Sequence, residues 1–437
     1  MGSSMKLCFI IYSYFPYGGQ QRDFMRILKE SLARGHSVDV FALRWEGEVP
    51  EGVTLHLAPV RALTRTRLYK KFTRWLEREL SRFADATVVG FNKMPHLDVY
   101  YAADPCFAEM AAEQRPSYYR FTSRFAHFSE YEAAVFGADS GTEVLYLSPQ
   151  QRAAFRAYYP ACESRLHALP AGLAEDRRPE DRTTAGRRAR HVAARARLAE
   201  ELAVDAEKTL ILQIGSGFRV KGVDRALRAI AALPAARRER VHYLLVGSGK
   251  PKPYLALARK LGIGERVSIV GGRDDVPALL AAGDLMFHPA YRESAGYTLL
   301  EAVVAGLPVL TTATCGYAYH IEQARAGRVC GEPITQEAID AALAQTLEEL
   351  AAAPWSENGL AYGADDSLFS LPQAAVDFIE RFEKHAAKAA QVQSRVKKLE
   401  KIDKLEPPKK RVLVPFELRQ PPRPDLLVTD HIPMQGG

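Results

Sequence analysis

Two glutamates and the short segment between them are the residues of this chain best suited to chemistry. Glu293 and Glu301 stand on either side of a polar loop that runs into a helical pattern. Backbone N–H groups at a helix start suit a phosphate, and Gly296 would let a ligand approach the backbone closely. The glutamates could accept hydrogen bonds from neutral hydroxyls, such as those of a ribose. A plainer alternative is an acidic residue near the positive end of a helix and a second one facing solvent. The candidate phosphate-binding residues are Ser294, Ala295, Gly296, Tyr297 and Thr298.

The elements that must position this loop form a βαβ unit. An apolar run, Leu285 to Phe287, ends at His288-Pro289, and a helical pattern that opens at Tyr297 stops at Gly306-Leu307-Pro308. A second apolar run begins at Val309. The loop therefore lies at the carboxyl end of a strand, where open α/β sheets bind their ligands.

A similar strand, loop and helix open the chain. Gly18 and Gly19 follow the buried-type strand Lys6 to Ile11, but they do not form the GxGxxG pattern of dinucleotide-binding folds. Asp23 falls in the first turns of the helix, where it could equally be a partner of the helix dipole. Asp104 follows the strand 97–101 and would face the ligand-binding edge, although a lone aspartate at a strand end is usually a helix N-cap.

Several sequence motifs together resemble the retaining nucleotide-sugar glycosyltransferases of family 4. The pair Glu293-x7-Glu301 is followed by Ala302 and AGLPVL, and a lone E-x7-E would be a weak signal. More narrowly, seven motifs in the order of the family resemble bacterial lipopolysaccharide core glucosyltransferases and span roughly Met5 to Phe382. They are FPYGGQQRDFMRI, WEGE, VVGFNKMPHLDVYYAAD, YRFTSRF, KGVDR, HPAYRESAG and AGLPVLTTATCGYA.

The resemblance implies an α/β protein of the GT-B class, with two Rossmann-like doubly wound domains facing each other across a cleft. The acceptor-side domain would span 5–172 and the nucleotide-sugar domain 208–369, joined by an arginine-rich connector, 173–207. A helix at 370–386 would return to the first domain. The extension 387–437 is rich in lysine and proline, resembles the linker between the ATPase domains of F-type ABC proteins, and is expected to be flexible.

The same resemblance assigns roles to residues. Gly18 and Gly19 would approach the donor diphosphate, and Gly272 and Arg273 would lie near its base. A basic pair would neutralise the diphosphate: Lys221 keeps its place, whereas Val220 stands where the family has arginine. Whether Arg219, one residue earlier, can replace that arginine is left open by the sequence.

The implied reaction moves a hexose, most simply glucose, from a UDP-sugar to a heptose of the lipopolysaccharide inner core with retention at the anomeric carbon. Glu293 would orient the sugar and Glu301 the ribose, while Asp23 and Asp104 would position donor or acceptor. No metal or cofactor is expected, because the sugar-binding segments carry no DxD motif. The alternatives are another UDP-hexose, another glycan or lipid acceptor, or a nucleotide-binding module without transferase activity.

Composition bounds the partners and the compartment. The 437 residues suffice for two domains, and the net charge of +7 favours anionic partners. Aromatics interleaved with arginines in 106–136 suit an anionic membrane surface or stacking on nucleic acid, although internal packing is a further option. The resemblance favours the membrane, so no nucleic-acid partner is expected. The five cysteines show no CxxC pair, and no apolar run is long enough to span a membrane. We therefore expect a cytoplasmic protein, peripheral on the cytoplasmic face of the inner membrane.

The segment Glu175 to Arg197 carries many arginines and few large apolar residues. It could bind nucleic acid, but a solvated connector with a helix is the favoured interpretation.

Overall fold

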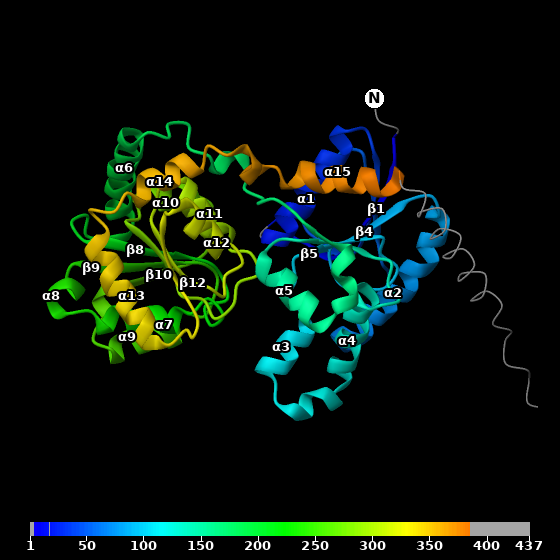
Figure 1. Cartoon of the computed structure of the whole chain (residues 1–437), viewed down its shortest axis with the longest axis horizontal. Helices are drawn as coiled ribbons and strands as arrows, with labels where there is room; N and C mark the ends of the chain where they lie inside the picture. The colour runs from blue at the N-terminus through cyan, green and yellow to red at the C-terminus, as the bar shows by residue number, and fades with distance from the viewer. Residues whose placement is uncertain (1–3, 17, 385–437) are drawn as a thin grey trace, which may run out of the picture.

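Two parallel sheets, each with helices on both faces, lie side by side in the structure (Figure 1). The structure is a computed structural model, and it describes residues 4–16 and 18–384. The extension 387–437 and Tyr17 lie outside the described residues. The two predicted doubly wound α/β domains are therefore both present.

The N-terminal sheet has seven strands in the order β3-β2-β1-β4-β5-β6-β7, and every neighbouring pair is parallel. The strand order reverses between β1 and β4, so the loops after these strands open at the point where such sheets bind ligands. The strands are β1 (Lys6–Tyr14), β2 (Ser37–Trp45), β3 (Val53–Leu57), β4 (Thr87–Gly90), β5 (Val99–Ala102), β6 (Glu143–Tyr146) and β7 (Leu166–Ala168).

The helices of this domain follow the apolar periodicity of their sequences. Phe24, Ile27 and Leu28 share the buried face of the first helix, as their spacing predicts. The α-helices are α1 (Gly19–Ala33), α2 (Arg65–Leu80), α3 (Phe107–Gln114), α4 (Ser123–Phe136) and α5 (Pro149–Tyr158). Short 3-10 helices are η1 (Ser81–Phe83), η2 (Ser117–Phe121), η3 (Pro160–Arg165) and η4 (Glu175–Arg177).

The C-terminal sheet has six parallel strands in the order β10-β9-β8-β11-β12-β13. Here the order reverses between β8 and β11, and the βαβ unit predicted around the two glutamates is β11, α11 and β12. The strands are β8 (Thr209–Ile214), β9 (Val241–Val246), β10 (Val267–Val270), β11 (Leu285–His288), β12 (Val309–Thr312) and β13 (Gly327–Cys330).

Helices surround this second sheet, and the last of them leaves it. The helices are α6 (Thr184–Leu202), α7 (Val223–Ala232), α8 (Ala235–Arg238), α9 (Lys252–Lys260), η5 (Gly264–Arg266), α10 (Val276–Ala282), α11 (Tyr297–Val304), α12 (Ala318–Ala324), α13 (Gln336–Glu349), α14 (Trp355–Tyr362), η6 (Asp366–Phe369) and α15 (Leu371–Lys384). Helix α15 lies along α1 of the N-terminal domain, where Arg34 pairs with Asp377 at 2.5 Å (Figure 1).

The arginine-rich segment contains the expected helix and most of its residues are exposed, but two of its arginines are buried. Helix α6 packs against α10 of the C-terminal domain. Arg187 is buried and donates to the carbonyl oxygens of Ala281 and Gly283, at 2.8 and 2.9 Å. Arg195 is likewise buried and donates to the carbonyls of residues 205, 206 and 208. These arginines bind backbone carbonyl oxygens at the end of α10 and in the segment before β8. The charge of the segment alone does not reveal this role.

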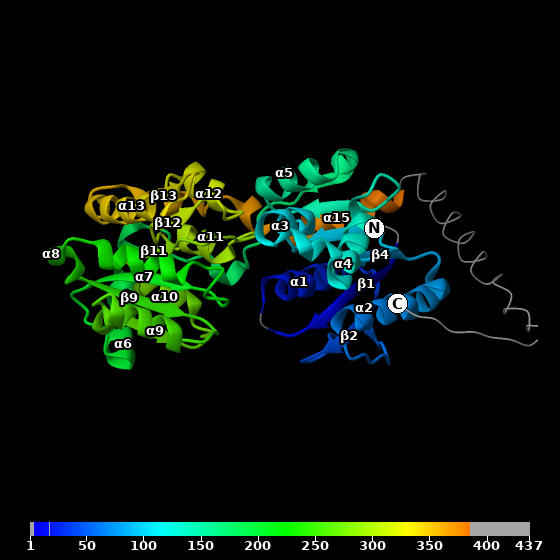
Figure 2. The ribbon, with the colours of Figure 1, turned by 90° about the horizontal axis from the view of Figure 1, so that it is seen from below.

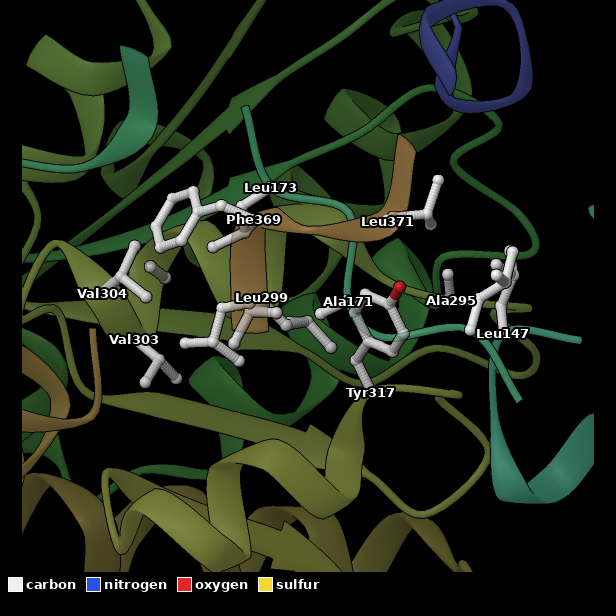
Figure 3. Close-up of a cluster of buried hydrophobic side chains, with 14 of the residues drawn as sticks. Leu147, Ala171, Leu173, Ala295, Leu299, Val303, Val304, Tyr317, Phe369 and Leu371 are labelled. Atoms are coloured by element: carbon white, nitrogen blue, oxygen red, sulfur yellow. The ribbon is translucent and has the colours of Figure 1, made fainter. Parts of the chain in front are cut away.

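One apolar core runs through both domains. Leu147, Ala171 and Leu173 of the first domain belong to the same buried cluster as Leu299 and Phe369 of the second (Figure 3). Seen from below, the two domains lie side by side, with α11 and α12 of the second domain on the side toward α3 of the first (Figure 2). All five cysteines are buried thiols. Among the described helices, none combines the length and apolarity needed to cross a bilayer.

Candidate active site

The loop after β11 carries the central acid of the site. The N–H of Gly316 donates to the Glu293 carbonyl at 2.9 Å, and the N–H of Tyr317 donates to the Ala295 carbonyl at 2.7 Å. Gly296 precedes α11 with φ 99°, a left-handed conformation that favours glycine, and no side chain caps the helix. The first N–H groups of a helix have no acceptor within it, so this loop presents them beside Glu293.

The Glu293 carboxylate contacts a half-buried cation. Lys221, in the loop between β8 and α7, contacts Glu293 Oε2 through its ammonium nitrogen. His288 Nε2 lies 3.4 Å from the same oxygen, and its ring is 1% exposed. Burial lowers the pKa of Lys221 to about 8 and that of His288 to about 3, so the imidazole is neutral at physiological pH. The two loops therefore place one carboxylate and one ammonium group at the switch point of the sheet.

The glycine loop of the N-terminal domain faces the start of α11. Gly19 begins α1, and a Cβ on it would lie 3.6 Å from Cδ2 of Tyr297. Gly18 has φ 147°, and a Cβ there would approach Gln21 Oε1 to 2.4 Å. The N-termini of α1 and α11 thus meet, one from each domain, and both favour negative charge.

Asp23 joins the two domains through its carboxylate. Its Oδ2 accepts hydrogen bonds from Tyr101 Oη at 2.6 Å and from Tyr297 Oη at 2.5 Å. Arg26 lies 3.4 Å from Oδ1. Burial raises the pKa of Asp23, and the two phenols and Arg26 oppose that shift. The predicted donor-binding Tyr297 is therefore held by an acid of the opposite domain.

Glu301 lies on the next turns of α11 and is 3% exposed. Its Oε1 is 3.6 Å from Arg177 Nε and 3.8 Å from Arg22 Nη1. Burial raises the pKa of Glu301, and the two arginines lower it. This carboxylate is separate from the Lys221 pair and faces the connector and α1.

Asp104 follows β5 and belongs to a separate cluster in the N-terminal domain. Burial raises the pKa of Asp104, while Lys93 and a hydrogen bond with Asn92 act against this shift. Lys93 also contacts Glu132, which accepts the N–H groups of Phe107 and Ala108 at the start of α3. Asp104 is therefore supported by the residues that anchor α3.

Two of the predicted basic residues are not drawn into the Glu293 cluster. Arg219 is exposed, as is Val220, whose carbonyl accepts the N–H of Tyr291 at 2.9 Å. Arg273 pairs with Asp275 at 2.6 Å and with Glu201 at 2.9 Å. It follows β10, two strands from β8, and so stands roughly 10 Å along the sheet from the Lys221 loop. Gly272 precedes it, with a Cβ position 3.4 Å from Ser248 Oγ.

The sequence did not single out several residues that complete the site. They are His288, which touches Glu293; Tyr101, which binds Asp23; and Arg22 and Arg177, which flank Glu301. His288 directly follows the apolar run that predicts β11, so its position at the end of that strand could have identified it. The arginines could not, because they are brought to Glu301 from other elements.

Within residues 4–16 and 18–384, no group of three or more His, Cys, Asp or Glu side chains could hold a metal ion.

Comparisons with known proteins bear on the family and the fold of the chain. A family model described as glycosyl transferases group 1 matches residues 194–360, and one described as ABC transporter matches residues 373–416. The chain is 41% identical over 376 residues to lipopolysaccharide glucosyltransferase WaaG of Escherichia coli K12, which covers 86% of this chain and 98% of the relative.

Solved structures give the same result for the fold. A crystal structure of WaaG, a glycosyltransferase involved in lipopolysaccharide biosynthesis, matches with a TM-score of 0.77 at 41% identity, covering 85% of this chain and 99% of that one. Sucrose-phosphate synthase from Thermosynechococcus elongatus matches with a TM-score of 0.67 at 17% identity, over 86% of this chain and 98% of the other. The second match bears on the fold alone. Together these findings confirm the GT-B fold predicted from the sequence.

Proposed function

Because this chain belongs to the group 1 glycosyl transferases and is a hexosyltransferase of the GT-B fold, we propose that it transfers glucose from UDP-glucose to a heptose of the lipopolysaccharide inner core. The observation that carries the proposal is the Lys221–Glu293 pair beside the start of α11, in a chain that spans nearly all of a lipopolysaccharide glucosyltransferase. Glycosyl transfer itself follows from the family; the donor, the acceptor and the residue roles are the proposal.

The donor diphosphate would lie between the N-termini of α1 and α11, next to Lys221. Its departure is the largest electrostatic demand of the reaction, because negative charge develops on the leaving phosphate. The ammonium group and two sets of helix N–H groups would stabilise that charge without reorganising. Gly19 would keep the opposite wall free of side-chain atoms.

Glu293 would bind and orient the transferred sugar rather than attack it. Retention commonly uses a carboxylate nucleophile on the far face of the sugar. Here the carboxylate is already in contact with the ammonium group of Lys221, which favours a hydrogen-bonding role. We propose a front-face route in which the leaving phosphate takes the proton of the acceptor hydroxyl.

The other acids would act in binding. Glu301, which lies beside Arg22 and Arg177, would accept hydrogen bonds from ribose hydroxyls. Asp23 would hold Tyr297 and with it the start of α11, while Asp104 would position the acceptor. No metal is required by this scheme, and none is proposed as a cofactor.

The enzyme would bind its acceptor at a membrane surface. Helices α3 and α4 and the segment between them protrude from the N-terminal domain (Figure 1). Phe107, Phe125 and Phe128 pack on one another, whereas Tyr118 and Phe121 are 70% and 91% exposed. These rings stand among exposed arginines, which suits an anionic surface. We therefore propose a cytoplasmic enzyme that docks on the cytoplasmic face of the inner membrane.

A donor panel tests the function. Purified protein would be mixed with UDP-sugars and inner-core lipopolysaccharide ending at heptose, with and without EDTA, alongside Glu293→Ala. We expect EDTA-resistant transfer of glucose, reduced about a hundredfold or more in the variant, because a preorganised polar group of the site is lost. Glu348→Gln, an exposed acid on α13, is the matched control and should retain activity. Binding of UDP-glucose without transfer to any acceptor would contradict the proposal and leave a nucleotide-binding module.

A further inference from the structure

His288 is buried beside the two charged groups of the proposed donor site. Its side chain is 1% exposed, and Nε2 lies 3.4 Å from Glu293 Oε2 without the alignment of a hydrogen bond. Among the described residues, neither ring nitrogen has a hydrogen-bond partner. A buried polar group without a partner destabilises the folded protein, so its presence needs an explanation. The imidazole is neutral, and one of its nitrogens therefore carries a hydrogen that it can donate.

The backbone holds His288 in place. The residue ends β11, which pairs with β12. Its carbonyl accepts hydrogen bonds from Thr311 Oγ1 and from the N–H of Ala290, both at 2.9 Å. A closer contact between the imidazole and Glu293 therefore requires the carboxylate to move toward the ring.

Lys221 differs from His288, because its main chain is anchored while its long side chain can turn. Gln213 Nε2 donates to the Lys221 carbonyl at 2.8 Å, and Tyr243 Oη donates to Gln213 Oε1 at 2.5 Å. Beside the side chain lies Gly215, where a Cβ would stand 3.7 Å from Lys221 Cε. The flexible four-carbon stem of the lysine therefore has room to turn its ammonium group from Glu293 toward a diphosphate.

A bound diphosphate changes the partner that Lys221 prefers. It carries more negative charge than a carboxylate, so it attracts the ammonium group and weakens the contact with Glu293. The Glu293 carboxylate then lies beside an anion and needs another hydrogen-bond donor. His288 is a short movement away from the same carboxylate oxygen. Because the imidazole is neutral, it would hold the carboxylate without competing with Lys221 for the phosphate.

We propose that His288 is a positioning residue that replaces Lys221 as the partner of Glu293 when the donor binds. The inference rests on the proposed function and deepens it. The Nε2–H of His288 donates to Glu293 Oε2, and the carboxylate stays directed at the transferred sugar while Lys221 binds the diphosphate. The imidazole keeps its proton throughout. His288 therefore supports the transfer step and contributes little to the affinity for the donor.

Steady-state kinetics and donor titration separate this role from a structural one. His288→Leu removes the donor nitrogen, so we expect kcat to fall about tenfold while the Kd for UDP-glucose stays within about twofold. His288→Gln places an amide N–H near the position of Nε2 and should recover kcat to within about threefold of wild type. An equal loss of kcat in the two variants, or a parallel rise in Kd, would overturn the inference.

His242→Leu is the matched control for these variants. His242 is also a buried histidine of the C-terminal sheet, but it lies near the start of β9, at the opposite edge of the parallel strands from the Glu293 loop. Its replacement should leave kcat and the Kd for UDP-glucose within about twofold of wild type. A fall in kcat equal to that of His288→Leu would show a general effect of removing a buried histidine and would contradict the assigned role.

Nitrogen NMR of protein with labelled histidines tests the exchange in the unaltered chain, so it does not depend on whether the variants fold. We expect the Nε2–H signal of His288 to move downfield when UDP is added, as a hydrogen bond to a carboxylate forms. Wild-type transfer together with an unmoved signal would overturn the inference alone. If wild-type protein binds UDP-glucose but transfers no sugar to any acceptor, the proposed function fails and the role of His288 fails with it.

Discussion

At the scale of single residues, Lys221 supplies the positive charge of the proposed donor site. It is a half-buried cation in contact with Glu293, and burial lowers its pKa to about 8. A diphosphate binds the charged ammonium, so donor binding favours the protonated form. The affinity for the diphosphate should therefore be highest well below pH 8 and should decline as the pH rises through that value.

We predict that the affinity for UDP-glucose falls about tenfold between pH 7 and pH 9, because the charged fraction of Lys221 falls by roughly that factor around a pKa near 8. Isothermal titration at several pH values measures the effect. Lys221→Arg is the control, because arginine stays charged over this range and should remove the pH dependence. A pH-independent wild-type affinity would show that Lys221 does not bind the diphosphate.

The sequence identified most of the residues at this centre but not their partners. Glu293 stands out because it lies in a loop between a predicted strand and a predicted helix, whereas Lys221 is singled out by the family resemblance. Tyr101 and Arg177 are different, since they reach Asp23 and Glu301 only after separate elements have packed. No local pattern marks such a residue, because its neighbours are remote in the chain.

At the scale of elements, α1 and α11 are linked by a hydrogen bond between domains. Tyr297 opens α11 and donates from its hydroxyl to the buried carboxylate of Asp23 on α1 at 2.5 Å. Tyr101 of β5 donates to the same oxygen at 2.6 Å. The acid on α1 therefore fixes the first residue of the helix whose N–H groups face the proposed diphosphate.

We predict that Tyr297→Phe weakens donor binding and lowers stability by about 1.5 to 3 kcal/mol, the usual contribution of a hydrogen bond to a charged group. The ring and its packing are retained, so the loss reports the hydroxyl alone. Urea unfolding and donor titration would measure the two effects. Tyr101→Phe is the matched control: it should cost similar stability but change donor affinity less, because Tyr101 is not on α11. Unaltered unfolding of Tyr297→Phe would contradict the link.

Elements were more predictable than their packing. Strands such as β8 and β11 are continuous apolar runs because both faces are covered, and helices such as α1 repeat their apolar residues at helical spacing. The sequence predicts the helix of α6 but not the burial of Arg187 and Arg195. Their long side chains bury themselves by binding carbonyls at the ends of other elements, which composition cannot show.

At the scale of the whole molecule, the two domains share an apolar core, and the N-terminal domain exposes aromatic side chains between α3 and α4. The shared cluster contains Leu147 and Leu173 of the first domain together with Leu299 of the second (Figure 3). Helix α15 adds a second connection through Arg34 and Asp377. With the domains joined in this way, a membrane contact made by α3 and α4 would also bring the Glu293 loop near the lipid surface, because Arg292 of that loop pairs with Glu113 of α3.

We predict that the protein binds vesicles containing anionic lipid and that Phe121→Ser weakens this binding about tenfold or more. Burial of one phenyl ring contributes about 1.5 to 3 kcal/mol, and each nearby arginine about 1 kcal/mol on an anionic surface. Phe121 is 91% exposed, and Arg115 and Arg120 beside it are exposed as well. Vesicle sedimentation at several salt concentrations would measure both contributions.

The control for this surface is Val192→Ser, which removes an apolar side chain that is 61% exposed on α6 of the other domain. Its vesicle binding should equal that of wild type. Arg115→Gln with Arg120→Gln should reduce binding at low salt and have little effect at high salt, because screening removes the electrostatic part of the interaction. If Phe121→Ser and Val192→Ser bind vesicles alike, the exposed aromatics do not dock on lipid. Transfer to lipopolysaccharide would then proceed without a membrane contact from α3 and α4.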